Sequence, residues 1–407
     1  MSKLEELIQK LCPNGVEYRP LGEVCKIIRG KGLCKDDIGN GNIPIILYGE
    51  LYTSYGNYIT QIKSSTDIEK VNNSPMIEFT DILLPISSTT KEAKIGKASA
   101  YTLNNKAYLG SDAILLKHHQ NCGFLVHLLN GSWFEKLKMQ CVSGTTINHL
   151  NPSKLSKIKI PVPPIEVQEE IVRILDKFTE LTAELTAELT ARKKQYEFYR
   201  DNILNFSNDV PRYKLAEIFN TRNGYTPSKN NKQFWNTSEI SWFRMEDIRE
   251  NGRILDKAIQ GVSISAVKGK AFPKNSIIIS TSATIGEHAL IKCESLANQR
   301  FTYLILKDEY KDKYNIMFLF YYCFVLDEYC KENLNQGNFA SVDMRKFNEF
   351  EFPMPSLEEQ DHIVAILDRF DKLCNDISEG LPAEIEARQK QYEYYRDKLL
   401  NFKEIAQ

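Results

Sequence analysis

One helical segment occurs twice along the chain, and this repeat constrains the fold more than any other feature. Residues 161–178 read PVPPIEVQEEIVRILDKF and residues 353–370 read PMPSLEEQDHIVAILDRF, with ten of 18 positions identical. Residues 191–206 read ARKKQYEFYRDNILNF and residues 387–402 read ARQKQYEYYRDKLLNF, with twelve of 16 identical. The offset rises from 192 to 196, so the second copy holds four more residues in its middle. Such self-similarity predicts an architecture built from two related halves.

Both copies have the apolar periodicity of a helix. In the first copy apolar residues recur at steps of three and four, at positions 171, 175, 178, 181, 185 and 189, and again at 196, 199 and 203. This pattern predicts one helix of about 40 residues with a single apolar face. A lone helix cannot hide such a face, so we expect the two copies to pack as an antiparallel coiled coil. Gly380-Leu381-Pro382 predicts a break in the second copy, with Pro382 starting a new helical run.

Two globular segments alternate with the helical ones and share a framework rather than a sequence. Leu21–Val24 corresponds to Leu215–Ile218, and Gly30 corresponds to Gly224. Both segments are rich in β-branched and aromatic residues interrupted by Gly, Asn and Pro, which predicts mainly β domains. The fold class expected is α+β, with two mainly β domains separated by two long antiparallel helices and an internal pseudo-two-fold repeat. The predicted boundaries are 1–160 and 207–354 for the domains, and 161–206 and 355–407 for the helical regions.

Composition is that of an ordinary globular protein, and the charge is unevenly distributed. The net charge is −1, but the two helical segments 165–206 and 357–402 together hold −8, which leaves +7 for the rest. The basic parts are therefore the ones suited to an anionic partner such as DNA. Nine scattered cysteines without a C-x-x-C pair fit a reducing cytoplasm. We expect neither a signal peptide nor a membrane span, because no apolar run is long enough.

His118, His119, Cys122 and His127 lie close together in the sequence, and a metal site is one interpretation of this cluster. Their spacing matches no standard zinc pattern, so surface or core positions are the favoured interpretation. The G-x-G at Gly39–Gly41 lies in a polar stretch and is interpreted as a turn rather than as a phosphate loop. The chain has no G-x-x-x-x-G-K-(S/T) motif and no Asn/Asp-Pro-Pro-aromatic motif.

The alternation of similar helices with dissimilar globules suits a protein that measures distance between two sites. A helix of 42 residues is about 63 Å long at 1.5 Å per residue. That length corresponds to about 18 base pairs of DNA at most, at 3.4 Å each. Two related domains held by paired helices would contact two half-sites, and differing domains would read different half-sites.

These motifs closely resemble the specificity subunits of type I restriction–modification enzymes. The resemblance is carried by Pro-x-Pro-x-x-Glu-x-Gln at 161–168 and 353–360, by Ile-Leu-Asp-(Lys/Arg)-Phe at 174–178 and 366–370, and by the Lys-Gln-Tyr-Glu-x-Tyr-Arg-Asp run at 194–201 and 390–397. In the second globule, Gly224–Ser228 and Ile240–Trp242 resemble the family's target-recognition domain. The match covers essentially the whole chain and is less clear in the first globule.

The resemblance implies a non-catalytic subunit that binds double-stranded DNA together with two methyltransferase subunits and two restriction subunits. Each recognition domain would read one half of a bipartite, asymmetric site, while the helices set the spacer and dock the methyltransferases. S-adenosylmethionine, ATP and magnesium would be bound by the partner subunits, and this chain itself would need no cofactor and no metal. Residues 179–191 read TELTAELTAELTA, either a stable run of helix formers or a spacer cassette. The second interpretation is favoured, because the family uses such four-residue repeats.

Base reading requires polar side chains presented on loops. Candidates in the first globule are Arg29, Lys31, Ser88, Thr89, Lys91, Thr145, Thr146 and Asn148. Candidates in the second are Arg222, Tyr225, Thr226, Lys229, Arg244, Thr281, Ser282, Gln299, Arg300, Asn338 and Ser341. Candidates for methyltransferase docking are Tyr196, Tyr199, Arg200, Tyr392, Tyr395 and Arg396, with intramolecular packing as the alternative for the tyrosines.

Two other classes of protein stay open at this point. A structural adaptor with protein-binding globules would show no sequence-dependent DNA binding even with a methyltransferase present. A catalytic methyltransferase or nuclease would be active as the purified chain with its cofactor.

Overall fold

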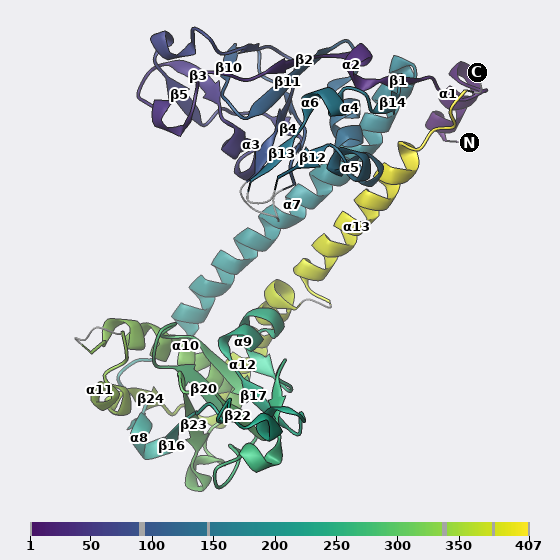
Figure 1. Cartoon of the computed structure of the whole chain (residues 1–407). Coiled ribbons are helices and arrows are strands. Elements are labelled where there is room, and N and C mark those ends of the chain that lie inside the picture. Colours follow the sequence, from purple (N-terminus) through teal and green to yellow (C-terminus); the bar gives the residue numbers. More distant parts are fainter. Residues whose placement is uncertain (1, 89–93, 145–146, 336–339, 377–378, 406–407) are drawn as a thin grey trace. The chain divides into compact units, whose positions relative to one another are not determined.

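The computed structural model describes residues 2–88, 94–144, 147–335, 340–376 and 379–405 of the chain. The chain divides into two compact units (Figure 1). Unit 1 comprises residues 1–185 and 385–407, and unit 2 comprises residues 186–384. Each unit combines one globule with helix segments from both copies of the repeat. Candidates Thr89, Lys91, Thr145, Thr146 and Asn338 lie outside the described residues.

The long helix predicted from the first copy is present as α7, Ile165–Ile203, with 39 residues. The break predicted in the second copy is also present, because α12 spans Leu357–Asn375 and α13 begins anew at Leu381 and ends at Leu399. Pro382 is the second residue of α13, where its missing N–H costs no helical hydrogen bond.

Each unit is built around a five-stranded sheet, and the two sheets share one topology. In unit 1 the strand order is β2-β11-β7-β9-β4, formed by Cys25–Arg29, Ala113–His118, Ile82–Pro85, Ser99–Tyr101 and Tyr58–Ile59. In unit 2 the order is β16-β23-β20-β21-β18, formed by Phe219–Asn223, Phe301–Leu306, Ser276–Ser280, His288–Ile291 and Ile254–Leu255. In each sheet the first four strands pair antiparallel and the last pair is parallel.

Smaller sheets complete each globule. Unit 1 adds β5-β3-β10-β6, formed by Ser64–Thr66, Ile43–Ile46, Ala107–Leu109 and Met76–Ile77, and β12-β13-β8, formed by Val142–Ser143, Asn148–Leu150 and Ser87–Ser88. Unit 2 adds β19-β17-β22, formed by Gly261–Val262, Ile240–Phe243 and Ser295–Ala297. A two-stranded ribbon in each unit joins the ends of the globule: Tyr18–Pro20 (β1) pairs with Lys159–Pro161 (β14), and Arg212–Lys214 (β15) pairs with Glu351–Pro353 (β24). The globules are thus mainly β, as predicted.

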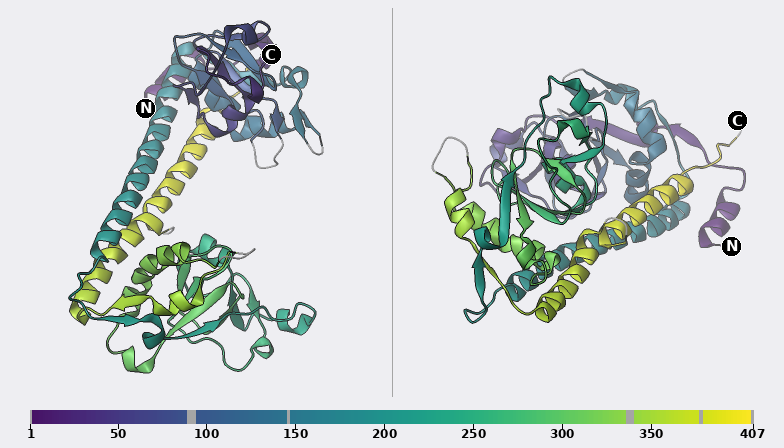
Figure 2. Two further views of the ribbon diagram at one scale, coloured as in Figure 1. Left: turned by 90° about the vertical axis from the view of Figure 1, so that its left-hand side faces the viewer. Right: turned by 90° about the horizontal axis from the view of Figure 1, so that it is seen from below.

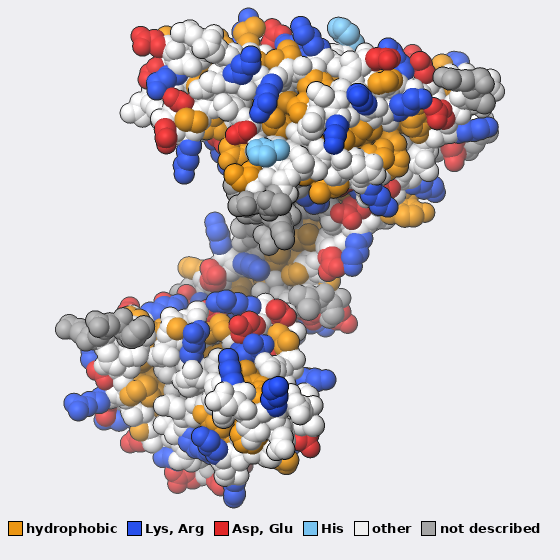
Figure 3. Space-filling view, viewed as in Figure 1, with side chains coloured by type: hydrophobic (Ala, Val, Ile, Leu, Met, Phe, Trp, Pro, Cys, Tyr) orange, Lys and Arg blue, Asp and Glu red, His pale blue; other side chains and the backbone are white. Residues whose placement is uncertain are grey.

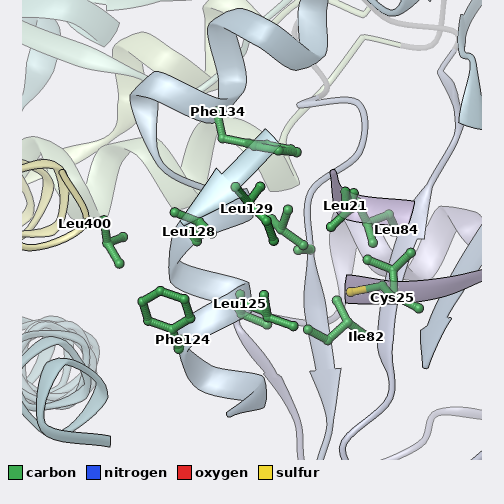
Figure 4. Packing of buried hydrophobic residues seen from close by; sticks show 14 of the residues in the cluster. Leu21, Cys25, Ile82, Leu84, Phe124, Leu125, Leu128, Leu129, Phe134 and Leu400 are labelled. Carbon is green, nitrogen blue, oxygen red and sulfur yellow. The ribbon is translucent and has the colours of Figure 1, made fainter. Parts of the chain in front are cut away.

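A buried helix lies against the main sheet of each unit, α4 (Cys122–Leu129) in unit 1 and α10 (Ile316–Glu332) in unit 2. Seven of the eight residues of α4 are buried. Figure 4 shows Leu125 and Leu129 of α4 directed toward Ile82 and Leu84 of β7, within one apolar cluster. The same cluster contains Ile171 of α7, so the helix and the globule share a core.

The repeated Pro-x-Pro-x-x-Glu-x-Gln motif joins helix to globule in the same way in both units. The Gln168 side chain donates to the Pro163 carbonyl at 2.7 Å and accepts from the Asn121 backbone N–H, at the start of α4, at 3.0 Å. Gln360 donates to the Pro355 carbonyl at 2.9 Å and accepts from the Asn315 N–H, at the start of α10, at 2.8 Å. Both glutamines are fully buried, and these bonds satisfy their amides.

The two copies of the repeat pack on each other inside each unit. In unit 1 α13 runs antiparallel beside the first part of α7, and Phe178 stacks on Tyr395 at 5.3 Å between ring centroids (Figures 1 and 2). In unit 2 Phe370 of α12 stacks on Tyr199 of α7 at 5.7 Å. Phe178 and Phe370 are equivalent in the repeat, as are Tyr395 and Tyr199. The pairing of copies predicted from the sequence is therefore present.

The glycines that correspond between the globules, Gly30 and Gly224, lie where a side chain has no room. A Cβ on Gly30 would lie 1.9 Å from the Gly110 carbonyl oxygen, and a Cβ on Gly224 would lie 2.3 Å from the Asn298 carbonyl oxygen. Because the obstacle in each case is backbone, the main chain itself would have to move.

We expect Gly30→Ala to destabilise unit 1 by about 2–3 kcal/mol, as overpacking of a rigid site does. Calorimetric unfolding of the purified chain should then show a transition lowered by several degrees. Gly49→Ala is the matched control, since a Cβ at Gly49 meets nothing within 4 Å. Equal transitions for the two variants would contradict the steric argument.

Candidate nucleic-acid interface

The loop after β16 is held by main-chain bonds to both the main sheet and the small sheet of unit 2. The Gly224 N–H donates to the Phe301 carbonyl at 2.8 Å, and the Tyr225 N–H donates to the Ala297 carbonyl at 2.7 Å. The Trp242 indole donates to the Tyr225 carbonyl at 3.0 Å. The loop therefore presents Thr226 and its successors from a fixed position beside the end of β22.

A basic hollow lies beside this loop. It has a volume of about 380 Å³ and is lined by Thr226, Lys229, Trp242, Arg244, Met245, Glu246, Arg249, Thr284, Asn298, Gln299 and Arg300. Four of these side chains are cationic and one is acidic. A second hollow of about 400 Å³ shares Lys229, Trp242 and Arg244 with the first. Figure 3 shows Lys and Arg side chains on the face of unit 2 turned to the viewer. Such a surface suits an anionic, hydrogen-bonding ligand.

Arg244 lies at the junction of the two hollows. Its guanidinium lies 5.6 Å from the centroid of the Trp242 ring, which in turn meets Trp235 edge-on at 5.1 Å. The buried Nε of Arg244 has no hydrogen-bond partner among the described residues, and its nearest acidic oxygen, on Glu246, is 3.9 Å away. Arg244 therefore keeps donor capacity for a ligand.

Five of the predicted DNA contacts in unit 2 come together in this hollow: Thr226, Lys229, Arg244, Gln299 and Arg300. Thr226 Oγ1 donates to the Gln299 Oε1 at 2.5 Å, which leaves the Gln299 amide N–H groups available. Gln299 and Arg300 are exposed.

The other candidates of unit 2 lie around this site. The Tyr225 hydroxyl accepts from the Lys268 N–H and donates to the Ala266 carbonyl, so this side chain braces the loop. Ser282 and Ser341 are joined by a backbone bridge, and Thr281 Oγ1 bonds Thr302 Oγ1 at 3.0 Å. Arg222 is exposed, with its guanidinium 4.6 Å from the Phe272 ring centroid.

In unit 1 the β8–β13 pairing brings Ser88 opposite Asn148. Arg29 ends β2 and is exposed, as is Lys31, whose carbonyl accepts from the Ser74 hydroxyl at 2.6 Å. Arg29 belongs to the five-stranded sheet, whereas Ser88 and Asn148 belong to the β12-β13-β8 sheet.

A polar cluster in unit 1 was missed by the sequence reasoning. Ser87 Oγ donates to Asp112 Oδ1 at 2.9 Å and lies 3.0 Å from His149 Nδ1. Two members of this cluster could have been predicted from their positions in the sequence, since Ser87 precedes the predicted Ser88 and His149 follows the predicted Asn148. Asp112 carried no such signal, because an acidic residue is not an obvious contact for DNA.

Three of the predicted docking residues are buried in their own units. Tyr196 and Tyr392 are 5% and 8% exposed, and Arg396 is 7% exposed. Tyr392 bonds His127 Nδ1 at 2.8 Å, and Arg396 donates to Ser132 Oγ at 3.0 Å. For these residues the structure favours packing within the chain over direct docking. Arg200 is also largely covered, lying 4.3 Å from the Phe324 ring centroid. Among the described residues of α7 and α13, the exposed aromatic ones are Phe198, Tyr199 and Tyr394, of which Phe198 and Tyr394 were not predicted.

The equivalent tyrosines 196 and 392 allow a matched test of this packing. Burial raises the pKa of both phenols, so both keep their protons. Only the Tyr392 hydroxyl is bonded, to His127; the buried Tyr196 hydroxyl has no partner among the described residues. Because a lost partner leaves His127 unsatisfied, we expect Tyr392→Phe to cost about 1 kcal/mol or more and Tyr196→Phe to be neutral or stabilising. Urea unfolding of both variants measures this difference, and equal costs would count against it.

Two histidines of this sequence cluster have partners other than a metal. His127 Nε2 contacts Asp176 at 2.8 Å, and His118 Nε2 lies 3.0 Å from the Thr80 carbonyl oxygen. Within the part of the chain that the structure describes, no three His, Cys, Asp or Glu side chains gather as a metal site. Among the same residues, no helix combines the length and apolar character needed to cross a membrane.

Comparison with known proteins agrees with this arrangement. The family model described as "Type I restriction modification DNA specificity domain" matches twice, at residues 13–192 and 208–387. The chain is 57% identical over 198 residues to the type I restriction enzyme EcoprrI specificity subunit of Escherichia coli, a match covering 47% of this chain and 49% of that protein. It is 35% identical over 431 residues to the EcoR124I/EcoR124II specificity subunit of Escherichia coli, covering 99% of this chain and 97% of that protein.

A solved structure has the same fold over nearly the whole chain. It comes from work on complex assembly and conformational transition of the type I restriction–modification system, and it covers 96% of this chain and 99% of its own with a TM-score of 0.67 at 16% identity. The twofold family match, the full-length relative and the duplicated α+β fold agree. The chain belongs to the type I restriction–modification DNA specificity family.

Proposed function

We propose that this chain is the DNA-specificity subunit of a type I restriction–modification complex and is not itself catalytic. The globule of each unit reads one half of a bipartite DNA site. The protein acts in the cytoplasm. The observation that carries the proposal is the duplication itself: one framework occurs twice, with closely repeated helices and dissimilar polar side chains. A protein that bound one symmetric ligand would have no need for two differing surfaces on one framework.

The basic hollow of unit 2 supports DNA as the ligand. Arg, Lys, Gln and Thr side chains converge there, and these side chains contact phosphates and base edges. The acidic helical segments offset this charge, which explains a net charge near zero. Affinity for DNA in isolation is therefore expected to be weak, and partner subunits strengthen it.

The partners supply the chemistry. Two methyltransferase subunits bring S-adenosylmethionine and methylate adenine, and two restriction subunits bring ATP and magnesium for translocation and cleavage. The repeat supports a stoichiometry of two, because the same helical surface occurs once in each unit. We place methyltransferase docking on the exposed aromatic residues Phe198 and Tyr394, which are equivalent in the repeat and are 66% and 63% exposed.

Long-read detection of methylated adenine tests this function. A host without other methyltransferases should carry the chain together with its methyltransferase partner. We expect one bipartite, asymmetric motif to become methylated, and neither component alone to produce it. Genome-wide absence of a motif with both components present would favour the protein-binding adaptor, and activity of the purified chain with cofactor alone would favour a catalytic protein.

A further inference from the structure

The two units place different residues at the same point of their shared frame. In unit 1 the Asp112 carbonyl accepts from the Ile86 N–H at 2.8 Å, and in unit 2 the Arg300 carbonyl accepts from the Thr281 N–H at 3.0 Å. In both units the next residue begins the second strand of the main sheet, β11 or β23. Its carbonyl accepts from the N–H of the equivalent glycine, Gly30 or Gly224. Asp112 and Arg300 are therefore structurally equivalent.

The surroundings of the two residues are equivalent as well. The Leu150 N–H donates to the Ile86 carbonyl at 2.9 Å, as the Val342 N–H donates to the Thr281 carbonyl at 2.9 Å. This register places Ser87 and His149 in unit 1 where Ser282 and Ser341 lie in unit 2. We call this position the corner of each unit: Ser87, Asp112 and His149 in unit 1, and Ser282, Arg300 and Ser341 in unit 2.

The two corners have opposite hydrogen-bonding character. Ser87 has one hydroxyl hydrogen, which Asp112 accepts, so the His149 contact requires a donating Nδ1–H. The second carboxylate oxygen of Asp112 then remains as an acceptor for a ligand. In unit 2 the exposed Arg300 guanidinium offers only donors, and it forms no ion pair with any described residue.

DNA limits what each corner can bind. Phosphate and sugar oxygens are acceptors, so a carboxylate facing DNA finds donors only on base amino groups, such as N4 of cytosine in the major groove. An arginine can instead bond O6 and N7 of guanine together. Asp112 also adopts a left-handed backbone, φ 61°, a conformation uncommon for residues other than glycine, although Asp tolerates it better than most.

We propose that Asp112 and Arg300 are equivalent base-reading residues of opposite preference: Arg300 selects a guanine in one half-site, and Asp112 selects a base that presents an amino group in the other. This inference rests on the proposed function and adds to it the residues and the class of base. The two corners would then prefer different bases because their charges are opposite. The base preferred by one side chain would leave the polar groups of the other side chain without hydrogen-bond partners.

Methylome sequencing of single variants with the methyltransferase partner tests the assignment. Arg300→Gln should lose discrimination at one guanine position of one half-site, by about 10-fold or more, and leave the other half-site unchanged. Asp112→Asn keeps the side-chain shape and tolerates the left-handed backbone. It should relax one position of the opposite half-site. Lys311→Gln and Asp36→Asn, at exposed positions of the same units, are the controls and should leave the motif intact.

Binding of the purified complex to duplexes with single base changes separates base reading from general DNA contact. Uniform weakening by Arg300→Gln across all duplexes, with a smaller salt dependence, would identify a phosphate contact and overturn the proposal. Unchanged motifs, or relaxation by both variants in the same half-site, would overturn it too. A failure of the proposed function would look different, since the unsubstituted complex would then methylate no motif.

Discussion

Deleting Thr182–Leu185 is expected to shorten the spacer of the recognised site by one or two base pairs and to leave both half-sites unchanged. The deleted residues form one complete Thr-Ala-Glu-Leu repeat in α7. Four residues contribute about 6 Å of rise and a net rotation of about 40° to a helix. The rise of about 6 Å corresponds to nearly two base pairs of DNA at 3.4 Å each. The rotation of about 40° corresponds to about one base pair, since DNA has 10–10.5 base pairs per turn.

The repeat tolerates deletion because its side chains are lightly packed. Glu184 is exposed and Leu185 is half-buried, whereas Ile171 and Leu175 in the preceding turns are fully buried. Removing four residues also keeps the helical phase of the flanking apolar stripe to within about 40°. The recognition domains should therefore fold as before, and only the spacing between their half-sites should change.

Methylome sequencing measures the spacer directly, and the repeat allows a graded series. Removing Thr182–Leu189 takes out two repeats and should shift the spacer about twice as far. Glu184→Gln changes the same repeat without changing its length and should leave the spacer as it is. A spacer unaffected by either deletion would show that α7 does not set the distance.

The elements that the sequence predicted well are those whose cause is local or repeated. The apolar steps from Ile171 to Leu189 were enough to predict α7, and Gly380 with Pro382 was enough to predict the gap before α13. Gln168 and Gln360 show why the motif is repeated, since each bonds the backbone that begins a buried helix. That role depends on contacts across more than 40 residues, which no local pattern contains.

The docking and DNA-contact residues were only partly predictable, because they depend on which side of an element faces the core. Tyr196 and Phe198 are two positions apart on one helix, yet the first is 5% exposed and the second 66% exposed. The sequence favoured Tyr196 and Tyr392 as docking residues because they are repeated. Their exposure shows instead that the nearby Phe198 and Tyr394 are the residues accessible to a partner. Arg300 was predicted from its residue type. Its equivalent, Asp112, needed the strand register of both units before it could be recognised.

Replacing Phe198 with Ser is expected to remove one of two bound methyltransferase subunits, and Tyr394→Ser the other. The two residues occupy the same position of the repeat, and each follows an equivalent exposed lysine, Lys194 or Lys390, by one helical turn. Each of the two rings meets a neighbouring ring of its own helix edge-on, Tyr199 at 5.7 Å and Tyr395 at 5.4 Å, and stays mostly exposed. At an interface such side chains are frequent anchors, and losing one costs 2 kcal/mol or more, about 30-fold in affinity.

Native mass spectrometry of the assembled complex distinguishes the outcomes by mass. The single variants should retain one methyltransferase copy each, and the double variant should retain none. Phe79→Ser is the matched control, because Phe79 is a similarly exposed aromatic residue, 57% exposed, that belongs to neither helix. Arg396→Glu is a poorer test than either single variant, since Arg396 is buried against Ser132 and Asp397 and its loss would disturb unit 1 itself.

Two methyltransferase copies retained by the double variant would place docking elsewhere on the chain. Loss of both copies in each single variant would instead mean that the two methyltransferases bind only as a pair.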